Sequence, residues 1–327
     1  MSEIAAPISF FGKLPTRGDF VRTSDNNNQL MLLLDRWAGQ GLELLSSDAA
    51  WKQVYDEAPP LNFAFLGSRS RQVIAGHILP SEDASQRRFP FLSATRLDVG
   101  TPLEFIGRSP LAFARLWATL GRMSREAKVA EDASAPLRDL SESKPLLNVA
   151  PSSYDAPFYD FLDLQSIGSL ERILRDSGHG AITMKWVLPG LGLLLHPILT
   201  GAALPIDKGL SLPLPRDPLY RPLLAAFWLD LIAGFVSRVD IELAILINEQ
   251  ESPRLLLGFN GADGATLHSA LDPRTAADRL IKVDDAEWVE DQLHSDYSLH
   301  KMASWLEHDD LSLRSARQVF RETFLGA

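Results

Sequence analysis

A twelve-residue segment near the start of the chain most strongly constrains its fold. Residues 10–21 read Phe-Phe-Gly-Lys-Leu-Pro-Thr-Arg-Gly-Asp-Phe-Val, which places two glycines, one proline and three charges among aromatic and branched apolar residues. The polar and apolar residues neither alternate nor recur every three to four positions, so no helix or strand period explains the mixture. Glycine and proline instead indicate a fixed irregular backbone. We therefore expect a shaped loop that is either a structural clasp or a recognition surface.

The charge balance disfavours a polyanionic partner. The chain has 42 acidic and 32 basic residues, a formal net charge of −10. Nucleic acids and anionic membrane surfaces both require a cationic face, so neither is expected to bind. A length of 327 residues with 46% hydrophobic content is enough for two domains with real cores.

The absence of cysteine removes several kinds of chemistry. Disulfides, thiolate metal sites and cysteine nucleophiles are excluded. The first residues lack a basic segment followed by an apolar one, so no signal peptide is predicted. The apolar runs 188–199 and 223–236 are shorter than the roughly 20 residues of a membrane span, and Asp230 interrupts the second run. We expect a cytoplasmic protein without membrane insertion.

A change in composition divides the chain. Residues 124–156 are rich in charges, serine and proline, so they are expected to form a linker or an exposed helical excursion. The pattern predicts an N-terminal α/β domain over residues 1–123 and a C-terminal α+β domain of uncertain role over residues 157–327.

Periodicity predicts the main elements of both parts. In the first part we expect a β-hairpin over residues 61–79, a strand over 89–97 and a helix over 102–120. In the second part we expect one or two strands within 182–195, a helix from 217 to 236 and a hairpin over 241–259.

Candidate catalytic and metal-binding residues are few. His77, Ser81 and Asp83 include the residue types of a nucleophilic triad, but the sequence has no G-x-S-x-G elbow around that serine. Residues 307–310 read Glu-His-Asp-Asp, and contiguous residues on a helix point in different directions. We therefore predict no catalytic residues, no metal site and no cofactor.

Two loops carry clustered opposite charges. Arg17, Asp19 and Arg22 lie around the opening loop, and Asp83, Arg87 and Arg88 lie in the loop after the first hairpin. Arginine suits an internal clasp that satisfies a carboxylate or loop carbonyls, and it equally suits a charged face that recognises a partner protein. Both interpretations stay open.

The same residues resemble a known family. Residues 11–21 are similar to the opening F-G-K-L-P-x-R-G-D-F-V of the TagF (ImpM) family, accessory proteins of bacterial type VI secretion. Further matches follow in order up to about residue 120: Trp37, Trp51, Tyr55, Ala58-Pro59, Phe63, Ala75-Gly76, Pro80-Ser81, Asp83, Arg87 and Phe89-Pro90. A long ordered series is more specific than any single motif.

The resemblance implies a fold and a function. It implies a three-layer α/β/α domain with a mixed sheet and a protein that is not an enzyme. TagF-like proteins hold type VI secretion in check after translation by engaging a forkhead-associated scaffold protein, in a pathway that also contains a threonine kinase and a phosphatase. The residues expected to bind the partner or to form a structural motif are Lys13, Arg17, Asp19, Trp37, Ser81, Asp83 and Arg87.

One departure from the family and one rival hypothesis remain. The family shows a glycine before the arginine of its G-R-x-F-P segment, and here that position is Gln86. If that glycine requires a positive φ, this loop must follow another path.

The rival hypothesis is a small-ligand sensor or hydrolytic enzyme with a pocket between the Arg17 loop and the Asp83 loop. Functional sites are often built from charged residues on irregular backbone.

Overall fold

The strands form one large sheet and one small one. A computed structural model describes residues 3–23, 28–199, 206–284 and 286–326. Over these residues the large sheet has nine strands in the order β11-β8-β10-β9-β4-β5-β6-β2-β3, and β1 pairs with β7. The strands are β1 (Glu3–Ala5), β2 (Ser9–Gly12), β3 (Val21–Arg22), β4 (Leu61–Gly67), β5 (Gln72–Leu79), β6 (Phe91–Asp98), β7 (Leu146–Asn148), β8 (Gly209–Pro213), β9 (Glu242–Asn248), β10 (Arg254–Gly258) and β11 (Leu280–Lys282).

The central strands are apolar on both faces. In β4, Phe63 and Phe65 belong to one core, while Ala64 and Leu66 belong to the other. Side chains alternate between the two faces of a strand, so a strand covered on both sides reads as a continuous apolar run. The pairing of β8 with β11 is parallel and the other pairs are antiparallel, so the sheet is mixed.

Helices cover both faces of this sheet. The first group is α1 (Asn28–Leu45), α2 (Trp51–Glu57), α10 (Gly264–Leu271) and α11 (Ala276–Arg279), which meet the core around Trp37 and Phe63. The second group meets the larger core: α3 (Pro102–Ile106), α4 (Ser109–Val129), α5 (Ser134–Glu142), η1 (Pro151–Tyr154), α6 (Asp155–Leu164), α7 (Ile167–Asp176), α8 (Met184–Leu199), α9 (Tyr220–Val236), α13 (Tyr297–Leu306) and α14 (Leu313–Leu325). Helix α12 (Val289–Ser295) packs on α8 and α13. The predicted α/β class with a mixed sheet between helical layers is confirmed.

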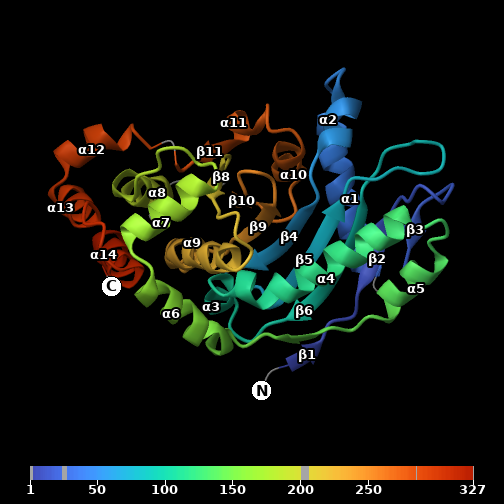
Figure 1. Cartoon of the computed structure of the whole chain (residues 1–327), viewed down its shortest axis with the longest axis horizontal. Helices are drawn as coiled ribbons and strands as arrows, with labels where there is room; N and C mark the ends of the chain where they lie inside the picture. Colours follow the sequence, from blue (N-terminus) through green and yellow to red (C-terminus); the bar gives the residue numbers. More distant parts are fainter. Residues whose placement is uncertain (1–2, 24–27, 200–205, 285, 327) are drawn as a thin grey trace.

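The two halves of the chain meet within the sheet. The predicted hairpins are β4-β5 and β9-β10, and β4 pairs with β9 from Leu61 opposite Asn248 to Gly67 opposite Glu242. Figure 1 shows β2, β5 and β6 toward one end of the molecule and α8, α12, α13 and α14 gathered at the other. Backbone hydrogen bonds therefore join the parts that we predict as separate domains, and the exact boundaries stay a prediction.

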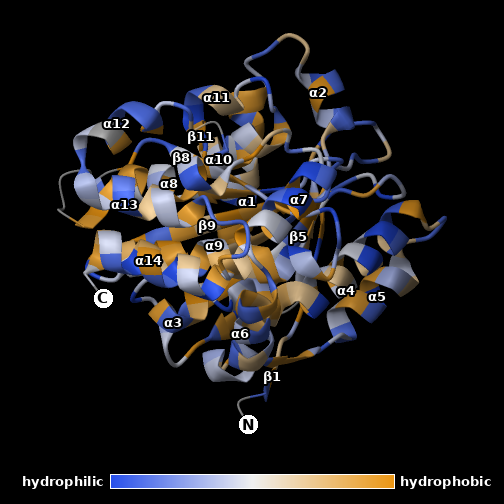
Figure 2. Cartoon of the chain, turned by 60° about the vertical axis from the view of Figure 1, so that its left-hand side comes forward, coloured by the Kyte–Doolittle hydropathy of each residue, from blue (hydrophilic) through white to orange (hydrophobic). Residues whose placement is uncertain are grey.

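The segment 124–156 is folded over most of its length. Helix α4 continues to Val129, α5 follows, and β7 pairs with β1. Ala133, Leu140 and Leu147 are buried in the larger core. Charged residues on the outer faces of these elements account for the polar composition of the segment (Figure 2).

The prediction of strands within residues 182–195 is wrong, because Met184–Leu199 is helix α8. Val187, Leu191 and Leu195 recur every four residues and are buried, so the helical period is present although Pro189 and Pro197 obscure it. Helix α9, near the centre of Figure 2, is also buried around most of its circumference. None of the helices built from described residues has the combined length and apolar character needed to cross a bilayer.

Candidate functional site

Adjacent strands bring the two charged loops together. Strand β2 pairs with β6, with Ser9 opposite Ala94 and Phe11 opposite Leu92, so the loop after β2 lies beside the loop before β6. Gly12 ends β2 with φ of 138°, and a Cβ added there would lie 2.0 Å from the carbonyl oxygen of Pro90. Only glycine permits this close approach, which explains the first glycine of the opening segment.

A buried ion pair links the two loops. Lys13 Nζ lies 3.0 Å from Asp83 Oδ2, and the side chains are 8% and 0% exposed. Arg87 Nε donates to the same Oδ2 at 2.7 Å. Asp83 Oδ1 accepts the backbone N–H groups of Ser85 at 2.9 Å and Arg87 at 3.0 Å. We call Lys13, Asp83 and Arg87 the clasp.

The clasp holds Asp83 in its charged form. Burial alone would raise the pKa of this carboxyl group. The backbone N–H of Arg87, the Lys13 ammonium, the backbone N–H of Ser85 and the Arg87 guanidinium outweigh that effect, so the pKa lies well below its ordinary value. Asp83 is therefore a fixed anion and is unsuited to accept a proton as a general base near neutral pH.

Backbone contacts complete the junction between the loops. The N–H of Ala84 donates to the carbonyl oxygen of Arg17 at 2.8 Å, and Arg87 Nη2 donates to the carbonyl oxygen of Gly18 at 2.8 Å. Arg17 Nη2 lies 3.0 Å from Asp132 Oδ1 and 2.5 Å from Ser134 Oγ. Backbone carbonyl groups of the opening loop thus bind Ala84 and Arg87 of the second loop, whereas the Arg17 guanidinium pairs with Asp132, outside both loops.

The loop at Gln86 keeps a positive φ without glycine. The N–H of Gln86 donates to the carbonyl oxygen of Asp83 at 2.8 Å, and Gln86 has φ of 61°. The expectation of another path is therefore wrong at this residue. The turn around Asp83 and the pairing of Glu82 with Arg88 hold the left-handed conformation, which costs a residue with a Cβ about 1–2 kcal/mol.

The outer surface of the opening loop remains open to solvent. Asp19 is exposed, and its Oδ1 accepts only the N–H of the next residue, Phe20, among the described groups. The Phe20 ring is 42% exposed, stacks on Phe11 with centroids 5.2 Å apart and lies 5.0 Å from Lys13 Nζ. An apolar ring with a neighbouring carboxylate is thus presented above the buried ion pair.

Trp37 and Ser81 lie apart from this surface. The Trp37 side chain is 1% exposed in the core beneath α1, and its Nε1 donates to the carbonyl oxygen of Asp263 at 3.2 Å. Ser81 is buried, and its backbone N–H donates to the Tyr55 hydroxyl, which itself donates to the Ser81 carbonyl oxygen, both at 3.0 Å. Burial raises the pKa of Tyr55. Sequence reasoning did not select Tyr55 as a site residue, although it belongs to the ordered series of matches.

The candidate triad does not form. His77 Nδ1 lies 2.8 Å from Asn62 Oδ1, and Asn62 Nδ2 donates to Glu249 Oε1 at 3.1 Å. Ser81 Oγ has no hydrogen-bond partner within the described residues, and the Asp83 oxygens belong to the clasp. His77 lines a separate cavity of about 150 Å³. The three side chains therefore do not act as one nucleophilic unit.

Glu307–Asp310 likewise show no metal-binding arrangement. Glu307 Oε1 accepts from Lys185 Nζ at 3.1 Å just beyond the end of α13. Within the ranges that the structure describes, no group of three or more histidine, aspartate or glutamate side chains is arranged to hold a metal ion.

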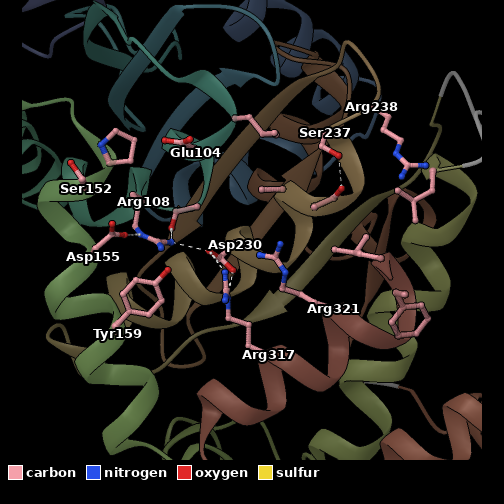
Figure 3. Close-up of a pocket in the computed structure, with 18 residues that line it drawn as sticks. Glu104, Arg108, Ser152, Asp155, Tyr159, Asp230, Ser237, Arg238, Arg317 and Arg321 are labelled. Atoms are coloured by element: carbon pink, nitrogen blue, oxygen red, sulfur yellow. Dashed lines mark hydrogen bonds and ion pairs between the residues drawn. The ribbon is translucent and has the colours of Figure 1, made fainter. Parts of the chain in front are cut away.

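A larger cavity lies where the halves of the chain meet (Figure 3). It has a volume of about 680 Å³ and is lined by residues of α3, η1, α6, α9 and α14 and by Arg108, which directly precedes α4. Asp230 Oδ1 accepts from Arg108 Nη1 at 2.9 Å, and Asp230 Oδ2 accepts from Arg317 Nε at 2.6 Å. Arg108 Nε also donates to Asp155 Oδ1 at 3.0 Å, and the Arg108 guanidinium lies 3.8 Å from the Phe158 ring centroid. Sequence reasoning missed this cavity, although Asp230 within an apolar run was a visible signal.

Comparisons with known proteins bear on the first half of the chain. Residues 9–142 match the family model of the TagF N-terminal domain, described as type VI secretion system-associated. The solved structure of PA0076 from Pseudomonas aeruginosa PAO1 is 23% identical, with 43% of this chain and 65% of that chain covered and a TM-score of 0.36. The match thus spans less than two thirds of that protein. No curated protein matches the sequence.

Proposed function

Because residues 9–142 belong to the TagF N-terminal domain family, which is associated with type VI secretion, we propose that this chain is a cytoplasmic repressor of that system. The match confirms the resemblance predicted from the opening motif and extends past residue 123. The repressor acts after translation by binding a forkhead-associated scaffold protein, and it catalyses no reaction. The single observation that carries the proposal is the family match.

The division of the opening segment into an inner and an outer layer supports a binding role. The inner layer, Lys13 with Asp83, is buried and fixes the shape of both loops. The outer layer consists of Asp19 and Phe20 with the exposed residues 84–87. A partly exposed aromatic ring surrounded by polar groups is typical of the residues that contribute most to protein–protein affinity. We propose this outer layer as the contact surface.

The test separates binding from folding. Asp19→Ala removes a carboxylate whose described hydrogen bond is to the N–H of the next residue, Phe20. The variant is therefore expected to unfold at the same temperature as wild type. Phe20→Ser removes the exposed ring, and Leu164→Ser is the matched control because Leu164 is 79% exposed on α6. We expect both loop variants to lose capture of the forkhead-associated scaffold protein and to raise secretion in a complemented deletion strain, while the control does neither. Folded loop variants with undiminished binding and repression would remove this surface from the interface.

A second candidate function is a small-ligand sensor or hydrolytic enzyme. A cavity of about 390 Å³ lies between Pro15 of the opening loop and the loop from Pro80 to Arg88, where the rival hypothesis expects a pocket. Three of its four charged side chains already have partners, since Arg88 pairs with Asp56 and Lys128 donates to the Pro80 carbonyl oxygen; the fourth is Glu82. Turnover or ligand binding that disappears in Ser81→Ala, with scaffold binding intact, would favour this alternative.

A further inference from the structure

The cavity of Figure 3 has the size of a small-molecule site. Its volume of about 680 Å³ falls within the roughly 300–1,000 Å³ usual for such sites. The first half of the chain supplies Arg108 at the start of α4, and the second half supplies Asp230 of α9 and Arg317 of α14. A ligand bound there would touch both halves.

The acids of the cavity neutralise only part of its arginines. Asp230 is shared by Arg108 and Arg317, and Asp155 also pairs with Arg108. Arg321 is half-buried and Arg238 is exposed, and neither makes an ion pair with any residue of the described ranges. The lining therefore presents guanidinium groups with unused donors.

Arg321 lies close to Arg317, so the excess positive charge is concentrated in one part of the cavity. Arg321 follows Arg317 by one helical turn on α14, and Figure 3 shows both side chains directed into the cavity near Asp230. Like charges four residues apart on a helix repel each other. Arg317 already donates Nε and Nη2 to Asp230, so a single anion could accept from Arg321 and from the remaining Nη1 of Arg317.

The net charge of the cavity lining is positive, whereas that of the whole protein is negative. Its lining carries four arginines and three acidic residues, of which Glu104 is exposed, whereas the chain has a net charge of −10. Arginine forks fit the oxygens of a phosphate group in pairs. The remaining wall includes apolar side chains that could accommodate an organic group: Leu103, Ala233, Phe324 and Leu325.

We propose that this cavity binds a small organic phosphate, with the phosphate group on Arg317 and Arg321 and the organic part along the apolar wall. Arg238 adds a third cation at the edge of the cavity. The inference goes beyond the repressor function, since it needs neither a partner protein nor the opening loop.

Calorimetric titration of the full chain tests the site with three probes: inorganic phosphate, adenosine monophosphate and adenosine. We expect adenosine monophosphate to bind more tightly than inorganic phosphate, because only the ester also covers the apolar wall, and adenosine not to bind. Failure of both phosphate probes to bind would overturn the proposal. Inorganic phosphate binding as tightly as the ester would overturn the assignment to an organic phosphate.

Variants then locate the binding. Arg321→Gln should weaken binding of adenosine monophosphate at least about tenfold, since a hydrogen bond to a charged group is lost. Arg321→Lys should recover part of the loss because it keeps the charge. Arg172→Gln is the matched control, since Arg172 is exposed on α7 outside the cavity. All three should unfold at the wild-type temperature, and equal affinity of Arg321→Gln and Arg172→Gln would refute the site.

Discussion

His77 makes the stability of this protein depend on pH. The side chain is 4% exposed on β5, beside the small cavity that Arg125 also lines. Asn62 directs its amide nitrogen to Glu249 and its oxygen to His77, so His77 Nδ1 carries the proton and Nε2 is an unprotonated acceptor. Nε2 has no partner within the described part of the chain. Burial, followed by the charge of Arg125, lowers the pKa of His77 to about 4.

The size of the effect follows from linkage. In the unfolded chain His77 titrates near its ordinary pKa of about 6.5, whereas in the folded chain the pKa is about 4. The folded state therefore resists protonation, and stability falls as the pH drops below the unfolded value toward the folded one. Each unit of pH in that interval costs about 1.4 kcal/mol, so acidification from about pH 7 to pH 5 removes about 2 kcal/mol through His77.

Urea unfolding of wild type and His77→Gln at both pH values isolates this contribution. The substituted side chain stays neutral, so the variant should lose about 2 kcal/mol less than wild type on acidification. Other titrating groups, including buried His179, are common to both proteins and cancel in the comparison. His300→Gln, at an exposed position on α13, should behave as wild type. Equal losses in wild type and His77→Gln would refute the reasoning.

Two further predictions concern the Asp83 loop. Gln86→Gly should raise the free energy of unfolding by up to about 1 kcal/mol, because glycine adopts the observed positive φ without strain. Ser85→Gly, the control, should lower the free energy of unfolding by about 0.5–1 kcal/mol. Chemical denaturation measures both changes, and the prediction is contradicted if Gln86→Gly does not stabilise the protein. Asp83→Asn leaves the buried Lys13 ammonium without its carboxylate, so it should lower the melting temperature clearly more than Asp56→Asn, which breaks the half-exposed pair with Arg88. Similar melting temperatures would show that the clasp does not stabilise the fold.

The sequence predicted which residues form the candidate site but not which of them are structural and which are exposed for binding. Glycines and a proline in residues 10–21 indicated a shaped loop, and Lys13, Arg17, Asp83 and Arg87 do meet there. The sequence could not decide between a structural clasp and a recognition surface, because it does not show whether a charged residue is buried or exposed. Burial separates them: Asp83 is covered, whereas Asp19 is in solvent.

Local patterns determined the elements that depend on neighbouring residues. The hairpins β4-β5 and β9-β10 and the long helix α4 follow from short-range turns and periodicity. Helix α8 was missed because two prolines in an apolar run hide its period. The motif also predicted the match of residues 9–142 to the TagF N-terminal domain, since an ordered series of residues can be recognised without knowledge of their contacts.

Only the tertiary structure decided which distant residues meet. The pairing of β4 with β9 joins residues about 180 positions apart, and Asp230 reaches both Arg108 and Arg317 across the two halves. Such contacts depend on the packing of helices on a shared sheet, which no local pattern encodes. Sequence alone therefore determined the shaped loop and the two hairpins. The three-dimensional fold determined which charges are buried in pairs and which arginines remain open to a ligand, because burial and distance set the energy of a charge.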